Sequence, residues 1–181
     1  MGQPKQFLPY QGRTLLRRAV EAGIQSGAEP VIVVVGDHVD QAVHELIGIG
    51  GAIIEPNPTW KCGMGTSIRI GLRRLLKERP GIEAVIIALC DQPFVEVKHL
   101  RQLRDVHMAT GKGVVASEYG QTLGPPCLFA ASWFDRLLAI GDDEGAKRLI
   151  LAAGEDCAVL PLPAGAVDID TPGDYETLSS H

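Results

Sequence analysis

Three things are scarce in this chain of 181 residues: long apolar runs, closely spaced cysteines and an excess of positive charge. No apolar run approaches the roughly 20 residues that a membrane span needs. No basic segment is followed by an apolar one in the manner of a secretory leader. The net charge of −5 disfavours a nucleic-acid partner. We therefore expect a protein with neither a membrane nor a nucleic acid as its partner.

The four cysteines are Cys62, Cys90, Cys127 and Cys157, and no two of them form a Cys-x-x-Cys pair. A zinc site would normally show closer pairing. The histidines likewise show no ligand spacing on one helix face, and no Ser-His-Asp or Cys-His arrangement can be argued. We expect reduced, mostly buried thiols in a cytoplasmic protein, and neither hydrolase nor thiol chemistry.

Apolar runs and helical patterns alternate along the chain, which predicts one α/β domain with a largely parallel sheet. The clearest strands are Val31–Val35 and Ala84–Cys90, whose continuous apolar sequences suit strands covered on both faces. Weaker strands begin at Ala52, Gly113, Cys127 and Cys157. Helices are predicted over 13–27, 67–79, 95–110, 144–154 and 171–180, and the Gly/Pro-rich segment 117–129 reads as less regular.

In a doubly wound sheet, ligands bind at the carboxyl ends of the strands. The sequence "LCDQP" places Asp91 at such an end, where a carboxylate can hold Mg²⁺ against a phosphate. The alternative is that Asp91 only caps the following turn.

A second candidate is "NPTWKCGMGTS", residues 57–67. Gly63 and Gly65 would let the backbone approach a ligand, and a helix starting at Thr66 or Ser67 would offer free N–H groups. The alternative is an ordinary helix entry in which Trp60 packs on the core and the glycines make a turn.

Two acidic segments are further candidates. In "DIDTPGDY", residues 168–175, Asp168 and Asp170 alternate along an extended segment, so one of them could join Asp91 at a metal. The alternative is that Asp170 and Asp174 only serve the start of a final helix. The segment "GDDEGAKRLI", residues 141–150, can equally be an acidic helix start.

The order of these motifs is more specific than any one of them. "MGQPKQFLPYQGRTLLRRAV", "VIVVVG", "NPTWKCGMGTSIRIGL", "CDQPFV", "GPPCLF", "GDDEGAKRLI" and "DIDTPGDY" together resemble the molybdenum cofactor cytidylyltransferase family of MobA-like nucleotidyltransferases, from Met1 to about Tyr175. The resemblance implies transfer of CMP from CTP to the terminal phosphate of molybdopterin, with loss of pyrophosphate and a requirement for Mg²⁺. The product would serve xanthine dehydrogenase-like hydroxylases. A molybdoenzyme, or a chaperone that matures it, is a further candidate partner.

The same resemblance implies a Rossmann-like, three-layer α/β/α sheet of the nucleotide-diphospho-sugar transferase type, and roles for individual residues. Lys5 and Asp91 would be catalytic, with Lys5 on the phosphates and Asp91 on the metal. Asp170 is the favoured second metal ligand and Asp168 the other choice. Nucleotide contacts would come from Gly2, Lys5, Asn57, Gly63, Gly65, Ser67 and Asp91, and contacts to the pterin substrate from Gly124, Pro125, Asp142, Gly145 and Ala146.

One departure concerns the beginning of the pattern. The family starts with an apolar strand and a Leu-Ala-Ala-Gly-x-Ser-x-Arg loop immediately before "MGxPK", and neither precedes Met1 here. We expect residues 1–181 to be a single MobA-like domain, truncated at its N-terminus by about 15–20 residues that would supply a central strand and a phosphate-binding loop. The alternative is a natural chain that has lost catalysis.

Other functions remain open at this point. Transfer of GMP, or transfer to another phosphorylated acceptor, would use the same parts. A noncatalytic carrier of the molybdenum cofactor is the alternative from another class. A small oxidoreductase is disfavoured, because no Gly-x-Gly-x-x-Gly follows a strand.

Overall fold

The structure of the protein, a computed structural model, describes residues 4–163. Strands and helices alternate along most of this range, as the sequence predicts. The strands are β1 (Pro9–Tyr10), β2 (Arg13–Thr14), β3 (Val31–Val35), β4 (Ala52–Pro56), β5 (Ala84–Ile87), β6 (Val114–Tyr119), β7 (Thr122–Ala130) and β8 (Cys157–Pro161). The α-helices are α1 (Leu15–Gln25), α2 (Val39–Glu45), α3 (Met64–Glu78), α4 (Val97–Thr110), α5 (Phe134–Leu138) and α6 (Ala146–Ala153). Short 3₁₀ helices are η1 (Lys5–Phe7), η2 (Trp60–Cys62), η3 (Ala131–Trp133) and η4 (Gly154–Asp156).

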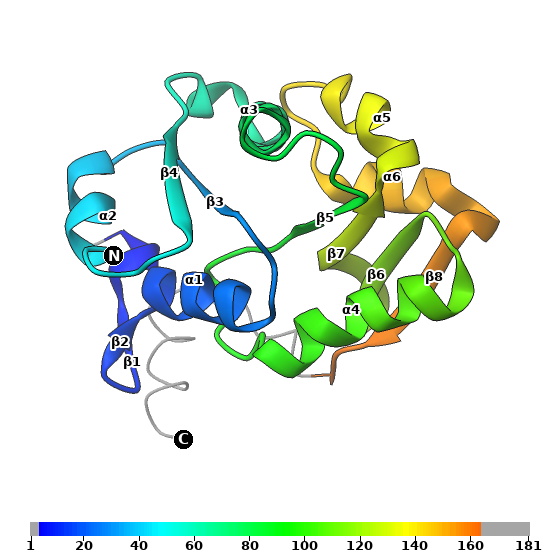
Figure 1. Cartoon of the computed structure of the whole chain (residues 1–181), viewed down its shortest axis with the longest axis horizontal. Coiled ribbons are helices and arrows are strands. Elements are labelled where there is room, and N and C mark those ends of the chain that lie inside the picture. The colour runs from blue at the N-terminus through cyan, green and yellow to red at the C-terminus, as the bar shows by residue number, and fades with distance from the viewer. Residues whose placement is uncertain (1–3, 164–181) are drawn as a thin grey trace.

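The main strands form a parallel pair, β3–β4, and a four-stranded sheet in the order β5-β7-β6-β8 (Figure 1). Strand β7 is antiparallel to both β5 and β6, whereas β8 is parallel to β6. It follows that β5, β6 and β8 point the same way and that β7 is the reversed strand. The predicted α/β class with mostly parallel strands is confirmed.

Helices cover both faces of the four-stranded sheet, because its strands alternate apolar side chains between the faces. Val114, Ala116 and Phe129 belong to a buried cluster with side chains of α3, α5 and α6. Val115 and Leu128 face the other way and pack under α4. These layers agree with the predicted three-layer arrangement.

The two sheets are not joined: within residues 4–163, no hydrogen-bonded ladder links β3 to β5. Figure 1 shows these strands facing each other across the middle of the molecule. The turn η1 lies at the carboxyl ends of both strands. The ring of Phe7 contacts His38 just after β3, with ring centroids 6.3 Å apart, and Lys5 acts electrostatically on Cys90 just after β5. We infer that β3 and β5 run in the same direction.

The open edge has a measurable effect on β5. All four residues of this strand are only half-buried, although their apolar sequence predicts cover on both faces. A cavity of about 640 Å³ is lined by side chains of α1 and α4 and by the segment that follows β5. Among the described residues, only β7 pairs with β5, and this apolar strand is half-exposed although it carries no polar face.

Several boundaries differ from the sequence expectations. Helix α3 begins at Met64, ahead of the predicted start at Thr66 or Ser67. The strand predicted over Ala84–Cys90 ends at Ile87, and segment 117–129 is mostly a regular hairpin of β6 and β7. Helix α2 was not foreseen, and the predicted helix at 171–180 lies outside the described residues. Among residues 4–163, no helix is long and apolar enough to cross a membrane.

Candidate nucleotide-binding site

Lys5 and Asp91 both act electrostatically on Cys90, which lies just beyond the carboxyl end of β5. Burial raises the pKa of Cys90 to about 11; the neighbouring Asp91 carboxylate adds to this rise, and the Lys5 ammonium opposes it. The Cys90 thiol therefore stays protonated at neutral pH. Lys5 and Asp91 are 86 positions apart in the chain, and the fold brings this cation and this carboxylate to one strand end.

Lys5 is held by the tight turn η1. The N–H of Phe7 donates to the Pro4 carbonyl at 3.1 Å, and the N–H of Leu8 donates to the Lys5 carbonyl at 3.0 Å. The side chains of Phe7 and Leu8 are both buried and fix this turn to the core. Lys5 is thus anchored by its neighbours along the chain.

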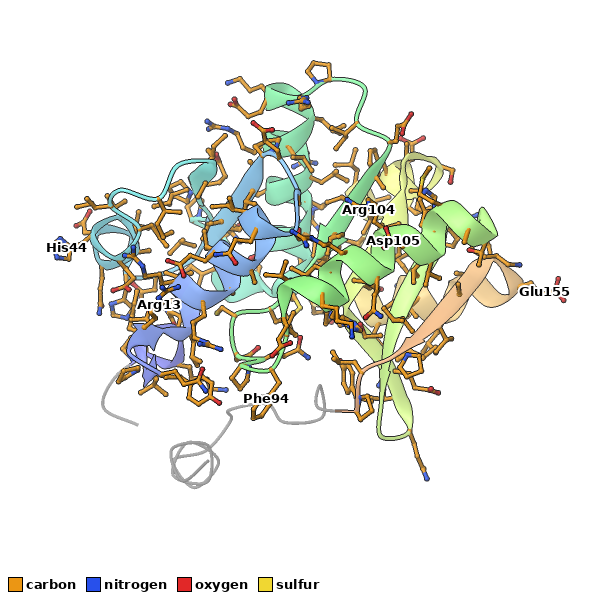
Figure 2. All side chains as sticks on the ribbon, turned by 60° about the horizontal axis from the view of Figure 1, so that its bottom comes forward. Arg13, His44, Phe94, Arg104, Asp105 and Glu155 are labelled. Atoms are coloured by element: carbon orange, nitrogen blue, oxygen red, sulfur yellow. The ribbon has the colours of Figure 1, made fainter. Side chains whose placement is uncertain are left out.

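The loop that carries Asp91 is closed by an aromatic contact. Phe94 lies on this loop beside the β1–β2 hairpin (Figure 2), and its ring meets Tyr10 of β1 edge-on, with centroids 6.3 Å apart. Gln92 and Pro93, between Asp91 and Phe94, are buried. The loop that carries Asp91 is therefore packed on both sides.

Asn57, which is predicted to contact the nucleotide, is bonded within the protein. Its side chain is fully buried, and its Nδ2 group donates to Thr66 Oγ1 at 2.8 Å and to Ser67 Oγ at 2.9 Å. Its Oδ1 atom accepts from the N–H and the hydroxyl of Thr59, each at 2.9 Å. An amide side chain has two donor and two acceptor positions, and protein groups use all four. Asn57 therefore shapes the loop through its internal hydrogen bonds, and its contact with a nucleotide stays a prediction.

The glycines of the 57–67 loop make room for another part of the chain. A Cβ atom at Gly65 would lie 1.9 Å from the Gly141 carbonyl oxygen, and one at Gly63 would lie 2.4 Å from that of Asp142. The Gly65 N–H donates to the Asp142 carbonyl at 2.9 Å. Helix α3 thus gives the Gly65 N–H to the chain itself, so this N–H is not free for an anion. The two segments predicted to face nucleotide and pterin form one packed unit.

Arg69 of α3 strengthens this unit. Its guanidinium donates to the Ile140 carbonyl and to the Asp142 carboxylate. Asp142 remains largely exposed, whereas Ala146, the first residue of α6, is 2% exposed and packs in the core. Both substrate contacts stay predictions: the side chain of Asp142 is exposed and that of Ala146 is buried. Gly145 is the residue just before α6. A Cβ atom added there would lie 3.6 Å from the sulfur of Met64, an ordinary contact distance.

The remaining predicted substrate residues lie on β7. Gly124 is buried, and an added Cβ there would lie 2.2 Å from the hydroxyl oxygen of Tyr119. Pro125 next to it is half-buried, and its carbonyl accepts a hydrogen bond from Gln92. Gln92 is a residue that the sequence reasoning passed over. The sequence does show an amide side chain directly after Asp91. No sequence pattern reveals that this amide bonds to the Pro125 carbonyl.

The metal site is partly outside the described residues, as are Gly2, Asp168 and Asp170. Among residues 4–163, no group of three or more His, Cys, Asp or Glu side chains could hold a metal ion. Mg²⁺ is usually bound through one or two carboxylates, with phosphate and water oxygens completing its shell. A hard oxygen ligand at the strand end, beside a lysine suited to phosphate, fits such a site. Asp91 is therefore compatible with Mg²⁺ in the company of a nucleotide.

Comparison with known proteins gives a consistent result. The family described as "MobA-like NTP transferase domain" matches residues 1–157. The purine catabolism protein PucB of Bacillus subtilis is 31% identical over 194 residues, which cover 97% of this chain and 88% of PucB. Nicotine blue oxidoreductase of Paenarthrobacter nicotinovorans is 33% identical over 104 residues, covering 58% of this chain and 48% of that protein. The crystal structure of Rv0371c from Mycobacterium tuberculosis superposes with a TM-score of 0.79 at 26% identity, covering 100% of this chain and 92% of Rv0371c.

Proposed function

Because the chain belongs to the MobA-like NTP transferase domain family and is a nucleotidyltransferase, we propose that it transfers CMP from CTP to molybdopterin. The observation that carries the assignment to this site is the pair Lys5 and Asp91 at the carboxyl end of β5. A relative named for purine catabolism supports the acceptor, since hydroxylases that oxidise purines use a dinucleotide form of the molybdenum cofactor. A molybdoenzyme or its maturation chaperone would receive the product.

In the proposed reaction, an oxygen of the molybdopterin phosphate attacks the α-phosphorus of CTP. The bond from the α-phosphorus to the bridging oxygen breaks, and pyrophosphate leaves with the electron pair. The groups that meet are all anionic, so positive charge must be placed where negative charge develops. Lys5 supplies one such charge from an anchored turn. Mg²⁺, when held by Asp91 and by Asp170 or Asp168, would supply the rest by neutralising phosphate oxygens.

A divalent metal is supported by one of the related structures. Rv0371c, which this chain resembles over nearly its whole length, has also been crystallised in complex with manganese. This complex is consistent with a metal requirement in the present chain. The choice of Mg²⁺ and of CTP remains part of the proposal.

Pyrophosphate release tests the function. The protein is incubated with molybdopterin, Mg²⁺ or Mn²⁺, and CTP, GTP or ATP in turn, and the dinucleotide product is identified by mass. We expect CTP with Mg²⁺ to give the highest rate. Preference for GTP would replace CMP by GMP transfer, and cofactor binding without turnover would favour the carrier function.

Point variants then test the residue roles. Lys5→Met and Asp91→Asn should each lower turnover at least tenfold, because each removes a charge from the reacting phosphates. The controls Lys77→Met on α3 and Asp105→Asn on α4 change the same charges at exposed positions and should leave the rate unchanged. A rate unaffected by Lys5→Met or Asp91→Asn would remove that residue from the mechanism.

We also propose that an apolar strand fills the gap between β3 and β5 in the active protein, and that residues ahead of Met1 supply it. The support is physical: two facing strand edges are unpaired with each other, and the apolar β5 is half-exposed. A strand parallel to both would end beside η1, and so beside Lys5.

Extended chains test this second proposal. One extension carries a β-branched apolar strand followed by a Gly/Ser/Arg loop, and a control extension has Gly-Pro pairs in place of the strand. The apolar extension should raise both the unfolding midpoint and the affinity for CTP, because it pairs the open ladders and completes the phosphate loop. Equal behaviour of the two extensions would show that the gap accepts no strand.

A further inference from the structure

Strand β7 contains two residues that have no partner in the adjacent strands β5 and β6. Ala116 of β6 is opposite Cys127, but the next residue, Ser117, is opposite Gly124. Pro125 and Pro126 therefore form a bulge, and the pairing of β7 with β5 also stops at Cys127. Proline has no N–H, so the main chain of this bulge offers only carbonyl acceptors. Buried carbonyls need donors from elsewhere.

Gln92 supplies the donor for the first of these carbonyls. Its Nε2 group donates to the Pro125 oxygen at 3.2 Å, and its side chain is 5% exposed. The carbonyl can only accept, which fixes the orientation of the amide. Since Gln92 follows Asp91 directly, the loop that carries the catalytic carboxylate also holds the bulge.

Ser117 and His99 serve the second carbonyl. The Ser117 hydroxyl donates its only hydrogen to the Pro126 oxygen. Its oxygen lies 2.7 Å from His99 Nε2, and this nitrogen must therefore be the donor of the pair. Burial lowers the pKa of His99, which favours a neutral ring, and the tautomer protonated on Nε2 supplies this donor. Both side chains are buried, at 0% and 6% exposure.

We propose that Gln92, Ser117 and His99 are positioning residues, which hold the Pro125–Pro126 bulge against the Asp91 loop and so set where the acceptor phosphate sits. This inference rests on the proposed function, in which the Gly124–Pro125 turn faces the acceptor. The nucleotide loop at 57–67 makes none of these contacts. We call the hydrogen bonds of Gln92 and Ser117 to the bulge, together with that of His99 to Ser117, the clamp. Loss of the clamp should therefore weaken binding of the acceptor more than binding of the nucleotide.

Steady-state kinetics separate these effects. Gln92→Met keeps the length of the side chain and removes the donor, and Gln41→Met on α2 is the control at an exposed glutamine. Gln92→Met should raise the KM for molybdopterin at least fivefold while the KM for the nucleotide changes less than twofold. Equal changes in both KM values, or no change at matched unfolding midpoints, would overturn the positioning role.

Conservative replacement gives an independent check at His99. In His99→Gln an amide N–H can reach Ser117, whereas in His99→Leu no donor remains. The KM for molybdopterin should be close to wild type in the first variant and raised in the second. If His99→Leu fails to fold, Gln92→Met on the loop still decides. An equal change of the KM for molybdopterin in the two His99 variants would contradict a role for the hydrogen bond from His99 to Ser117.

A final measurement keeps the clamp distinguishable from the proposed function. If the wild type transfers no nucleotide to any acceptor, the function is wrong, but the clamp can still be read by NMR. The ¹⁵N spectrum should show His99 protonated on Nε2, and the Cys127 amide should exchange faster in Gln92→Met than in Gln41→Met. A ring protonated on Nδ1 alone, or unchanged exchange, would refute the clamp whatever the activity.

Discussion

Replacement of Asn57 by alanine is the sharpest test of how the nucleotide loop is built. The change removes an amide that makes four hydrogen bonds inside the protein and that has no exposed surface. Thr66 keeps other partners, because its hydroxyl also reaches the carbonyls of Gly63 and Thr59. The Thr59 N–H and the Ser67 hydroxyl each lose the hydrogen bond that Asn57 makes with them.

The magnitude follows from these bonds. A net contribution of about 1 kcal/mol for each lost bond, offset where Thr66 and water provide substitutes, gives a destabilisation of roughly 2–4 kcal/mol. Ser67→Ala, which removes one of the four bonds, should cost only about 1 kcal/mol. Urea unfolding followed by tryptophan fluorescence measures both, and the ratio between the two variants is a check on the reasoning.

A nucleotide assay completes this test. If Asn57 only shapes the loop, residual activity of Asn57→Ala should keep the wild-type ratio of CTP to GTP use. A variant that unfolds within about 0.5 kcal/mol of wild type, well below the expected loss, but changes this ratio would refute the structural account. Asn57 would then read the base after all.

Three further predictions concern stability. Gly65→Ala should lower the unfolding midpoint strongly, because its Cβ would collide with the Gly141 carbonyl, whereas Gly50→Ala meets no atom within 4 Å and should be nearly neutral. The Gly113 N–H and the Trp133 indole N–H donate to Asp156 and lower the pKa of its carboxyl group. The stabilisation by Asp156 is therefore present above its ordinary pKa of about 3.9 and is lost as pH falls below it. Asp156→Asn should remove that part of the acid dependence when urea unfolding is measured as a function of pH. Burial lowers the pKa of His99, so stability should be complete above pH about 6.5 and decline as pH falls through the folded pKa, and His99→Gln should flatten this decline.

Much of the fold could be read from the sequence, because it depends on local patterns. The β-branched run Val31–Val35 became β3 without a change of boundary, and the helical spacing in α1 and α4 placed both helices within a few residues. Helix α2 escaped notice because its seven residues are too short for a periodic signal. The reversed direction of β7 was also beyond reach, since direction depends on pairing between distant segments.

The site could be predicted in outline and not in detail. The strand end before Asp91 was visible as an apolar run that stops at a carboxylate. The proximity of Lys5, and the packing of Gly65 on Gly141, depend on contacts across tens of residues. Asn57 shows the limit most clearly, because its residue type suits ligand recognition and internal hydrogen bonding equally well. Only its four partners distinguish the two.

The gap between β3 and β5 bears on how the molecule unfolds. One half, with β3 and β4, has its own buried cluster, which includes Phe7 beside Lys5; the other half, with β5 to β8, has separate clusters on each face of its sheet. Within residues 4–163, helix packing rather than a shared ladder connects them, and we expect each half to open as a separate cooperative unit. A nucleotide held by Lys5 from one unit and Asp91 from the other would make the two open together. Ligand binding would then appear in hydrogen exchange as a merging of two opening reactions into one.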